Sequence, residues 1–238
     1  MLPESRIPFH FGINYIFAPM PVLTKEAFLD LQKELGGQGI NFVTAQREET
    51  SFTFLKEAQS PNLQLKIIAG AQTPIGIGQL LIIESPPKED STFFIKQAEA
   101  ICLSFNNIWK QPFQIIKRDV CLRYLYQSKE QHAFQYLWEK RLGQNEAGLS
   151  ALGRPVLGGG LRLVMPPKKD EKIPCEIEVK IESFLRDTKK IFVETQFVWP
   201  QPLQPTKDFE PGKLLKMVGD YAKNEVIKFI TATPNGGN

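Results

Sequence analysis

Side chains that commonly perform catalysis are scarce in this sequence of 238 residues. Its two histidines, His10 and His132, have no Cys, Asp or Glu at a spacing typical of a metal site or an activated nucleophile. The sequence also contains no phosphate-binding loop, nucleophile elbow, zinc-protease motif or C-x-x-C pair. We therefore interpret each histidine as a structural or surface residue, and we expect no metal and no cofactor.

Carboxylates cluster on one side of the clearest strand pattern in the chain. Glu176, Glu178 and Glu182 alternate with apolar residues, and Lys180 lies among them. This pattern is typical of a solvated sheet face, or of a face paired with basic neighbours. It does not indicate a matched general acid and base.

One segment has a composition suited to anion binding. Four glycines and two arginines lie between Gly153 and Arg162; they include Arg154 and the run Gly158, Gly159 and Gly160. Consecutive glycines let the backbone approach a ligand closely, and free amides in such a turn can bind an anion. The segment lacks the Lys-Ser/Thr ending of a phosphate loop and precedes a strand, so a flexible connection or a bulged strand start is the alternative interpretation.

The elements that must position these residues follow the same order twice. In the first half, apolar residues alternate over residues 9–17, as in a strand with one buried face. A helix begins after Thr24, and a long helix ends before Pro112. Between them, extended runs are expected at residues 39–45, 51–56, 63–69 and 78–84, and the long helix at 91–110.

The second half repeats this order. A strand is expected at 116–126, and Ser128 and Gln131 have the spacing of a capping box at the start of the next helix. The apolar stripe of that helix contains Phe134, Leu137, Trp138 and Leu142. Three strands follow at 160–165, 174–184 and 190–199. A second long helix is expected at 212–231, with Phe229 on its apolar stripe.

This order predicts an α+β fold with a mainly antiparallel, curved sheet backed by two long helices. The unit β-α-β(n)-α would occupy residues 1–112 and again residues 113–238, and both halves would share one continuous sheet. Sequence identity between the halves is not evident, so the predicted duplication depends on element order alone.

Composition narrows the class of protein. With 42% hydrophobic and 23% charged residues, the chain is typical of a globular protein. No apolar run approaches the ~20 residues needed to span a bilayer, and the N-terminus lacks a signal-peptide pattern. We therefore expect a cytoplasmic protein with no membrane partner. The spacing of the three cysteines favours buried thiols over disulfides or a metal site; they are Cys102, Cys121 and Cys175.

Charge differs between the two halves. Residues 1–112 carry 9 basic and 11 acidic side chains, whereas residues 113–238 carry 20 and 15. A basic surface in the second half could attract phosphates or other anionic ligands. The sequence pI of about 8.6 nevertheless falls short of the strongly basic balance usual in nucleic-acid-binding domains.

Three short motifs carry a family resemblance. Arg123-Tyr124 near a strand end, the helix entry at residues 21–24 and the segment 221–224 of the terminal helix resemble a sporadically distributed prokaryotic protein family of similar length. The resemblance implies a bacterial cytoplasmic protein and transfers no catalytic residues. In architecture, the element order is similar to the saddle of the TATA-binding protein and to helix-grip ligand binders, which implies a curved sheet and none of their activities.

Our first functional hypothesis is a non-enzymatic binding or adaptor protein. Its curved sheet would offer a concave face to a protein or to a small, including anionic, molecule. The candidate ligand-binding residues are Arg118, Arg123, Tyr124, Tyr126, Arg154, Gly158, Gly159, Gly160 and Arg162. One alternative is an enzyme acting on a nucleotide or other phosphate-bearing substrate, with Arg154 and the glycine run as an anion clamp. Another is a nucleic-acid-binding protein that stacks bases on Tyr124, Tyr126 or Trp138.

Overall fold

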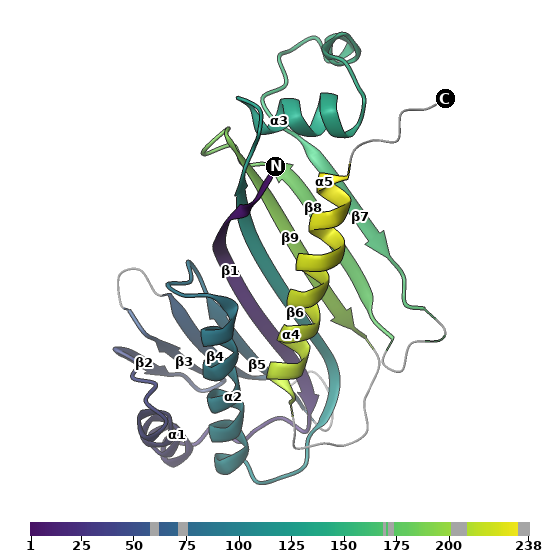
Figure 1. The fold of residues 1–238 in the computed structure, drawn as a ribbon. Coiled ribbons are helices and arrows are strands. Elements are labelled where there is room, and N and C mark those ends of the chain that lie inside the picture. The colour runs from purple at the N-terminus through teal and green to yellow at the C-terminus, as the bar shows by residue number, and fades with distance from the viewer. Residues whose placement is uncertain (58–61, 71–75, 169, 171–173, 201–208, 233–238) are drawn as a thin grey trace.

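The computed structural model describes residues 1–57, 62–70, 76–168, 170, 174–200 and 209–232. These residues form one curved antiparallel sheet in the order β2-β3-β4-β5-β1-β6-β9-β8-β7 (Figure 1). The α+β class and the mainly antiparallel sheet are therefore confirmed. The strands are β1 Leu2–Ala18, β2 Thr44–Arg47, β3 Ser51–Leu55, β4 Leu63–Gly70, β5 Ile77–Glu84, β6 Gln114–Gln127, β7 Gly160–Met165, β8 Glu176–Ser183 and β9 Lys190–Trp199.

The first strand of each half lies at the centre of the sheet. β1 and β6 pair antiparallel, with Phe11 opposite Leu122 and Ile13 opposite Val120. On one side of this pair, β5, β4, β3 and β2 follow in turn, and on the other side lie β9, β8 and β7. In both halves, therefore, the last strand returns to lie beside the first, and the sheet is continuous across the boundary at residue 112.

The main helices cover one face of the sheet (Figure 1). α1 spans Lys25–Gly37, and its N-cap Thr24 accepts a hydrogen bond from the Ala27 amide. α2 spans Ser91–Ile108, and its N-cap Asp90 accepts from the amides of Thr92 and Phe93. α4 (Pro211–Tyr221) continues through a π-helical turn, η3 (Ala222–Val226), into α5 (Ile227–Thr231). No helix among the described residues is long and apolar enough to cross a membrane.

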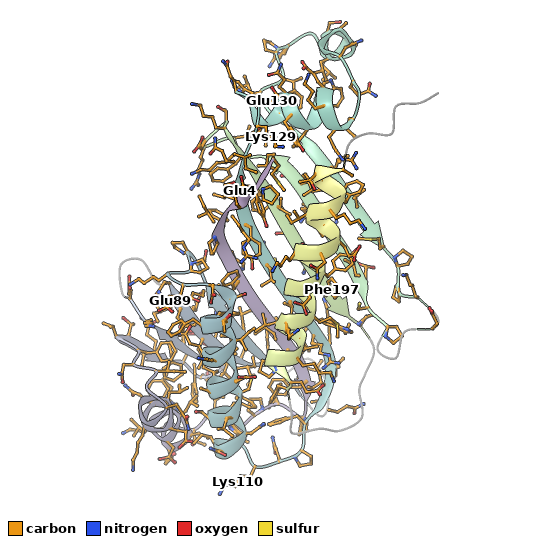
Figure 2. All side chains as sticks on the ribbon, viewed as in Figure 1. Glu4, Glu89, Lys110, Lys129, Glu130 and Phe197 are labelled. Carbon is orange, nitrogen blue, oxygen red and sulfur yellow. The ribbon has the colours of Figure 1, made fainter. Side chains whose placement is uncertain are left out.

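A single core lies between these helices and the sheet. α2 packs against α4, and both contact the central strands. Phe17 of β1 meets Phe105, Phe113 and Phe209 edge-on, with ring centroids 4.8–5.9 Å apart. Farther along, Phe197 of β9, which is labelled in Figure 2, contacts Tyr221 at the end of α4 edge-on. Because aromatic side chains bury large apolar areas, this continuous layer supplies much of the hydrophobic stabilisation.

Several predicted elements differ from the structure. The extended run expected at 39–45 contains only the start of β2, which begins at Thr44. Ser128 accepts a hydrogen bond from the Glu130 amide and does not form a capping box with Gln131, because the next helix begins later, after His132. The predicted burial of Phe229 is wrong: this ring is 40% exposed and lies 4.4 Å from the Arg141 guanidinium.

Candidate functional site

The two faces of β6 separate the predicted site residues. Tyr124 and Tyr126 point toward the helices and are 4% and 2% exposed. Tyr124 packs edge-on against Phe11 in the core. Arg118 also lies on this helix-covered face and is 2% exposed. The expectation that these three side chains line a free concave face is wrong, because even-numbered residues of β6 share the face that the helices cover.

Arg118 makes its contacts inside the fold and not with solvent. Its guanidinium lies 5.4 Å from the Trp199 ring centroid, and its Nη1 atom lies 3.8 Å from an oxygen of Glu210. Burial lowers the pKa of Arg118, since few polar groups solvate the cation. The Arg118 guanidinium therefore does not face solvent. It links β6 to β9 and to the start of α4.

The opposite face of the sheet carries a ladder of ion pairs across β7, β8, β9 and β6. Arg162 donates two hydrogen bonds to Glu178, at 3.0 and 2.8 Å. Lys180 bridges Glu178 and Glu194 at 3.0 and 2.7 Å, and Arg123 donates to Glu194 from the other side. Glu178 is paired with basic neighbours, as one interpretation of this acidic strand expected, whereas Glu176 and Glu182 are exposed, as the solvated-face interpretation expected. Arg123 and Arg162 are thus already paired within the chain.

These contacts shift the pKa values of both glutamates. The hydrogen bonds from Arg162 and Lys180 lower the pKa of Glu178 to about 2. Burial works to raise the pKa of Glu194, but the hydrogen bonds from Lys180 and Arg123 outweigh it, so the pKa is lowered. Both carboxylates remain ionised at neutral pH, which suits an ion-pair ladder and not a general acid.

His10 and Cys121 lie on the same face near the ladder. A register shift between Pro8 and His10 turns the histidine toward this face, and a Cβ on Gly12 would lie 3.1 Å from His10 Nε2. Burial lowers the pKa of His10 to about 4 and raises that of Cys121 to about 12. Neither is therefore charged at neutral pH, so the thiol is a poor nucleophile. Within the described ranges, no three His, Cys, Asp or Glu side chains are placed to hold a metal ion.

A cavity of about 880 Å³ lies at the end of the second half. Its walls come from α3 (Ala133–Gln135), the π-helical turn η1 (Tyr136–Arg141), the 3-10 helix η2 (Glu146–Leu152), the chain that follows η2 and the β8–β9 turn. Figure 1 shows α3 beyond the ends of the strands. The lining residues are His132, Phe134, Gln135, Trp138, Glu139, Leu149, Ser150, Gly153, Arg154, Pro155, Val156, Leu157, Leu185 and Thr188.

Aromatic and aliphatic side chains dominate the wall of this cavity. Phe134 and Trp138 stack at 5.8 Å with an angle of 24° between the rings, and the Trp138 indole donates to the Asn145 carbonyl at 3.0 Å. Leu157 and Leu185 are 77% and 68% exposed. Two leucines that remain this accessible beside a stacked aromatic pair form an apolar patch of the kind that marks binding sites.

Arg154 supplies a positive charge at the edge of this apolar patch. Its side chain is exposed and makes no ion pair with any described residue. Gly153, immediately before it, has a φ of +67° and ends η2, so a residue with a Cβ would be strained there. Of the nine residues predicted to bind a ligand, only Arg154 lines the cavity.

The glycine run holds β7 against β8. Gly159 donates to Ser183 Oγ and accepts from the Ser183 amide, both at 3.0 Å. A Cβ on Gly158 would lie 2.4 Å from Leu185 Cδ2, and a Cβ on Gly160 would lie 2.0 Å from the Ile181 carbonyl oxygen. The glycines therefore permit close strand contact at the start of β7, but the register from Gly160 to Met165 is unbroken, so the bulge that the alternative interpretation expected is not found there.

Sequence reasoning missed most of the cavity wall. Phe134 and Trp138 carry the spacing of a helical core stripe, so their pattern indicated burial against a sheet. Leu185 and Thr188 lie in a hairpin turn, where sequence alone gives no sign of a neighbouring cavity. The whole chain matches no protein-family model, and it matches no curated protein.

Proposed function

We propose that this chain is a non-enzymatic binding protein whose ligand site is the cavity between α3, η1, η2 and the β8–β9 turn. The observation that supports this proposal is the stacked Phe134–Trp138 pair in the same cavity wall as Arg154, whose exposed side chain makes no ion pair with the described residues. The ligand that fits is an apolar molecule, or an apolar protein side chain, that carries a carboxylate or a similar anionic group. The proposed ligand site therefore lies at the end of the second half, and not on the concave sheet face that the sequence led us to expect.

The size and chemistry of the cavity support this ligand class. A volume of about 880 Å³ lies within the range of small-molecule sites, which are mainly apolar with a few polar groups that orient the ligand. Burial of apolar ligand surface contributes roughly 25 cal/mol per Å². A charge-assisted hydrogen bond from Arg154 would then fix the anionic end of the ligand.

Trp138 provides a direct assay. We expect its fluorescence to change on titration with medium-chain carboxylates, and we expect the matching alcohols to bind more weakly. Loss of a charged hydrogen bond costs about 1.5–3 kcal/mol, so Arg154→Gln should weaken carboxylate binding by about 10- to 100-fold. Arg154→Gln should leave the affinity for the alcohols nearly unchanged.

Two control variants keep this assay interpretable. Arg47→Gln removes an exposed arginine on β2, in the other half, and should bind like the wild type. Trp138→Phe should abolish the signal, because Trp109 and Trp199 are buried elsewhere. Equal affinity of Arg154→Gln and wild type for carboxylates would contradict the assigned role of Arg154. Binding of nucleotides or inorganic phosphate without carboxylate binding would favour the phosphate-substrate enzyme instead.

We also infer that the two halves arose by duplication. The matched order of β1-β5-β4-β3 outward on one side and β6-β9-β8-β7 on the other supports this inference. So does the antiparallel pairing of β1 with β6, which is what a pseudo-two-fold axis between the halves would produce. Superposition of the backbones of the two halves should align β1 with β6 and β5 with β9, and a failure to align them would contradict the duplication.

A cytoplasmic location is part of the same proposal. No disulfide joins Cys102, Cys121 and Cys175, which suits a reducing compartment. Fractionation of the source cells should recover the chain with cytoplasmic markers, and recovery with exported proteins would contradict this location.

A further inference from the structure

The strand β7 forms an open edge of the sheet. Among the described strands, β7 pairs only with β8. The strand at the other edge, β2, is shorter, with four residues. β7 has six residues, contains no proline and pairs with β8 in an unbroken register from Gly160 to Met165. Natural sheets usually protect such an edge with prolines, bulges, charges or a covering element. In the described part of the chain, β7 has none of these apart from Arg162.

The hydrogen-bond pattern shows which backbone groups of β7 are free. The Ser183 amide donates to the Gly159 carbonyl, which makes residues 159 and 183 a hydrogen-bonded pair. Because such pairs alternate in an antiparallel ladder, residues 161, 163 and 165 direct their amide and carbonyl groups toward β8. Gly160, Arg162 and Val164 therefore direct theirs away from the sheet, toward the open edge.

The side chains of β7 fall into two rows. Leu161, Leu163 and Met165 point to the helix-covered face, where they are only partly buried; Met165 Sδ lies 3.4 Å from the Tyr221 hydroxyl. Arg162 and Val164 point to the other face, and Val164 is 52% exposed. An additional strand beside β7 would complete the burial of the apolar row and would cover Val164.

We propose that this edge pairs with β7 of a second copy of the chain, antiparallel, about a two-fold axis at Leu163. In this register, Leu163 faces its own copy, Leu161 faces Met165 of the second copy, and Arg162 faces Val164. The outward groups of Arg162 and Val164 then form a hydrogen-bonded pair on each side of the axis. Two nine-stranded sheets would join into one continuous sheet. This inference does not depend on ligand binding in the cavity.

Side-chain complementarity selects both the partner and the register. Because residues that face each other across a ladder lie on one side of the sheet, a two-fold axis must pass through a residue position. An axis at Arg162 would place two guanidinium groups directly opposite each other, which is unfavourable. An axis at Leu163 separates the charges, unites two apolar rows and ends the pairing at Pro166, which lacks an amide donor.

Light scattering over a concentration series tests the dimer. The wild type should reach twice the monomer mass, and Val164→Pro should remain a monomer, because proline removes only an outward amide of β7. Val164→Thr keeps the amide and a similar shape, so it should dimerise like the wild type. Circular dichroism and Trp138 fluorescence of Val164→Pro should match the wild type and show that the variant is folded.

Cysteine cross-linking tests the register. Residues of a non-hydrogen-bonded pair have Cα atoms about 4.5 Å apart, within disulfide reach, so Leu163→Cys should form covalent dimers under mild oxidation. Arg162→Cys should not, because its copy would lie beyond the distance that a disulfide spans. Monomeric wild type at all concentrations, a Val164→Pro dimer, or cross-linking at 162 without cross-linking at 163 would each overturn the proposal.

Discussion

The helix that follows the central strand has opposite surroundings in the two halves. In the first half, α1 lies on the sheet, where Phe28 contacts Phe52 and Phe54 at 5.1 and 5.3 Å, and Leu31 is fully buried. In the second half, α3 and η1 lie beyond the strand ends. There, Phe134 and Trp138 stack on each other and remain partly exposed.

A difference in strand number accounts for this contrast. Four strands follow α1, and the two outermost, β2 and β3, extend the sheet beneath that helix. Among the described residues, only three strands follow α3, and α3 contacts β8 and β9 from beyond their ends instead of lying across further strands. α3 is held instead by the Ala133 amide, which donates to Thr188, and η1 by the Tyr136 hydroxyl, which donates to Ile230. Phe134 and Trp138 have no described strand packed against them, and they form part of the cavity wall.

Truncation of one aromatic beside each helix, Phe54 of β3 beneath α1 and Phe134 of α3, should separate the two environments most clearly. Phe54 is fully buried under α1, so Phe54→Ala should lower the free energy of unfolding by about 3–5 kcal/mol. Phe134→Ala should lower it by only about 1 kcal/mol, since its ring already contacts solvent. Urea denaturation of both variants measures the difference. Equal losses would mean that α3 is packed as firmly as α1.

The ion-pair ladder offers a second comparison, between its buried and exposed ends. Glu194 is 3% exposed and accepts from two cations, so Glu194→Gln should destabilise the chain by about 1–3 kcal/mol. The Arg162 side chain is 64% exposed, and surface ion pairs contribute little, so Arg162→Gln should destabilise the chain much less than Glu194→Gln. A larger loss of unfolding free energy for Arg162→Gln than for Glu194→Gln would mean that the exposed end of the ladder, and not the buried end, contributes most to stability.

Acid titration gives the smallest expected effect. The pKa of Glu178 is about 2 in the folded chain and has an ordinary value near 4.5 when unfolded. Its contribution is therefore fully present above pH 4.5 and is lost as the pH falls toward 2. Thermal unfolding between pH 5 and 3 should show a shallower decline for Arg162→Gln than for the wild type. Parallel curves would show that Arg162 does not lower the pKa of Glu178.

Sequence patterns predicted the core better than the site, for physical reasons. Alternation along β1 and β6 and the stripe of α2 arise from burial on one face, so Phe11, Phe17 and Phe105 were placed correctly. The pattern also grouped Tyr124 and Tyr126 with the apolar residues of β6, and both are buried; only their assignment to a free binding face was wrong, because nothing local to β6 shows which of its faces the distant helices cover. Trp138 has the spacing of a core residue, but whether a strand lies beneath it depends on how far the whole sheet extends, which the local sequence does not show. Arg154 is exposed and lines the cavity, and its role in ligand binding stays a prediction.

The indole NMR signals of the three tryptophans test the central claim most directly. Titration of ¹⁵N-labelled protein with a medium-chain carboxylate should shift the Trp138 indole resonance to saturation, because this ring forms the cavity wall. The signals of Trp109 and Trp199 should stay in place, since both rings are buried in the core. A Trp138 signal that does not move at any ligand concentration, or three signals that move together, would contradict a ligand site at the end of the second half.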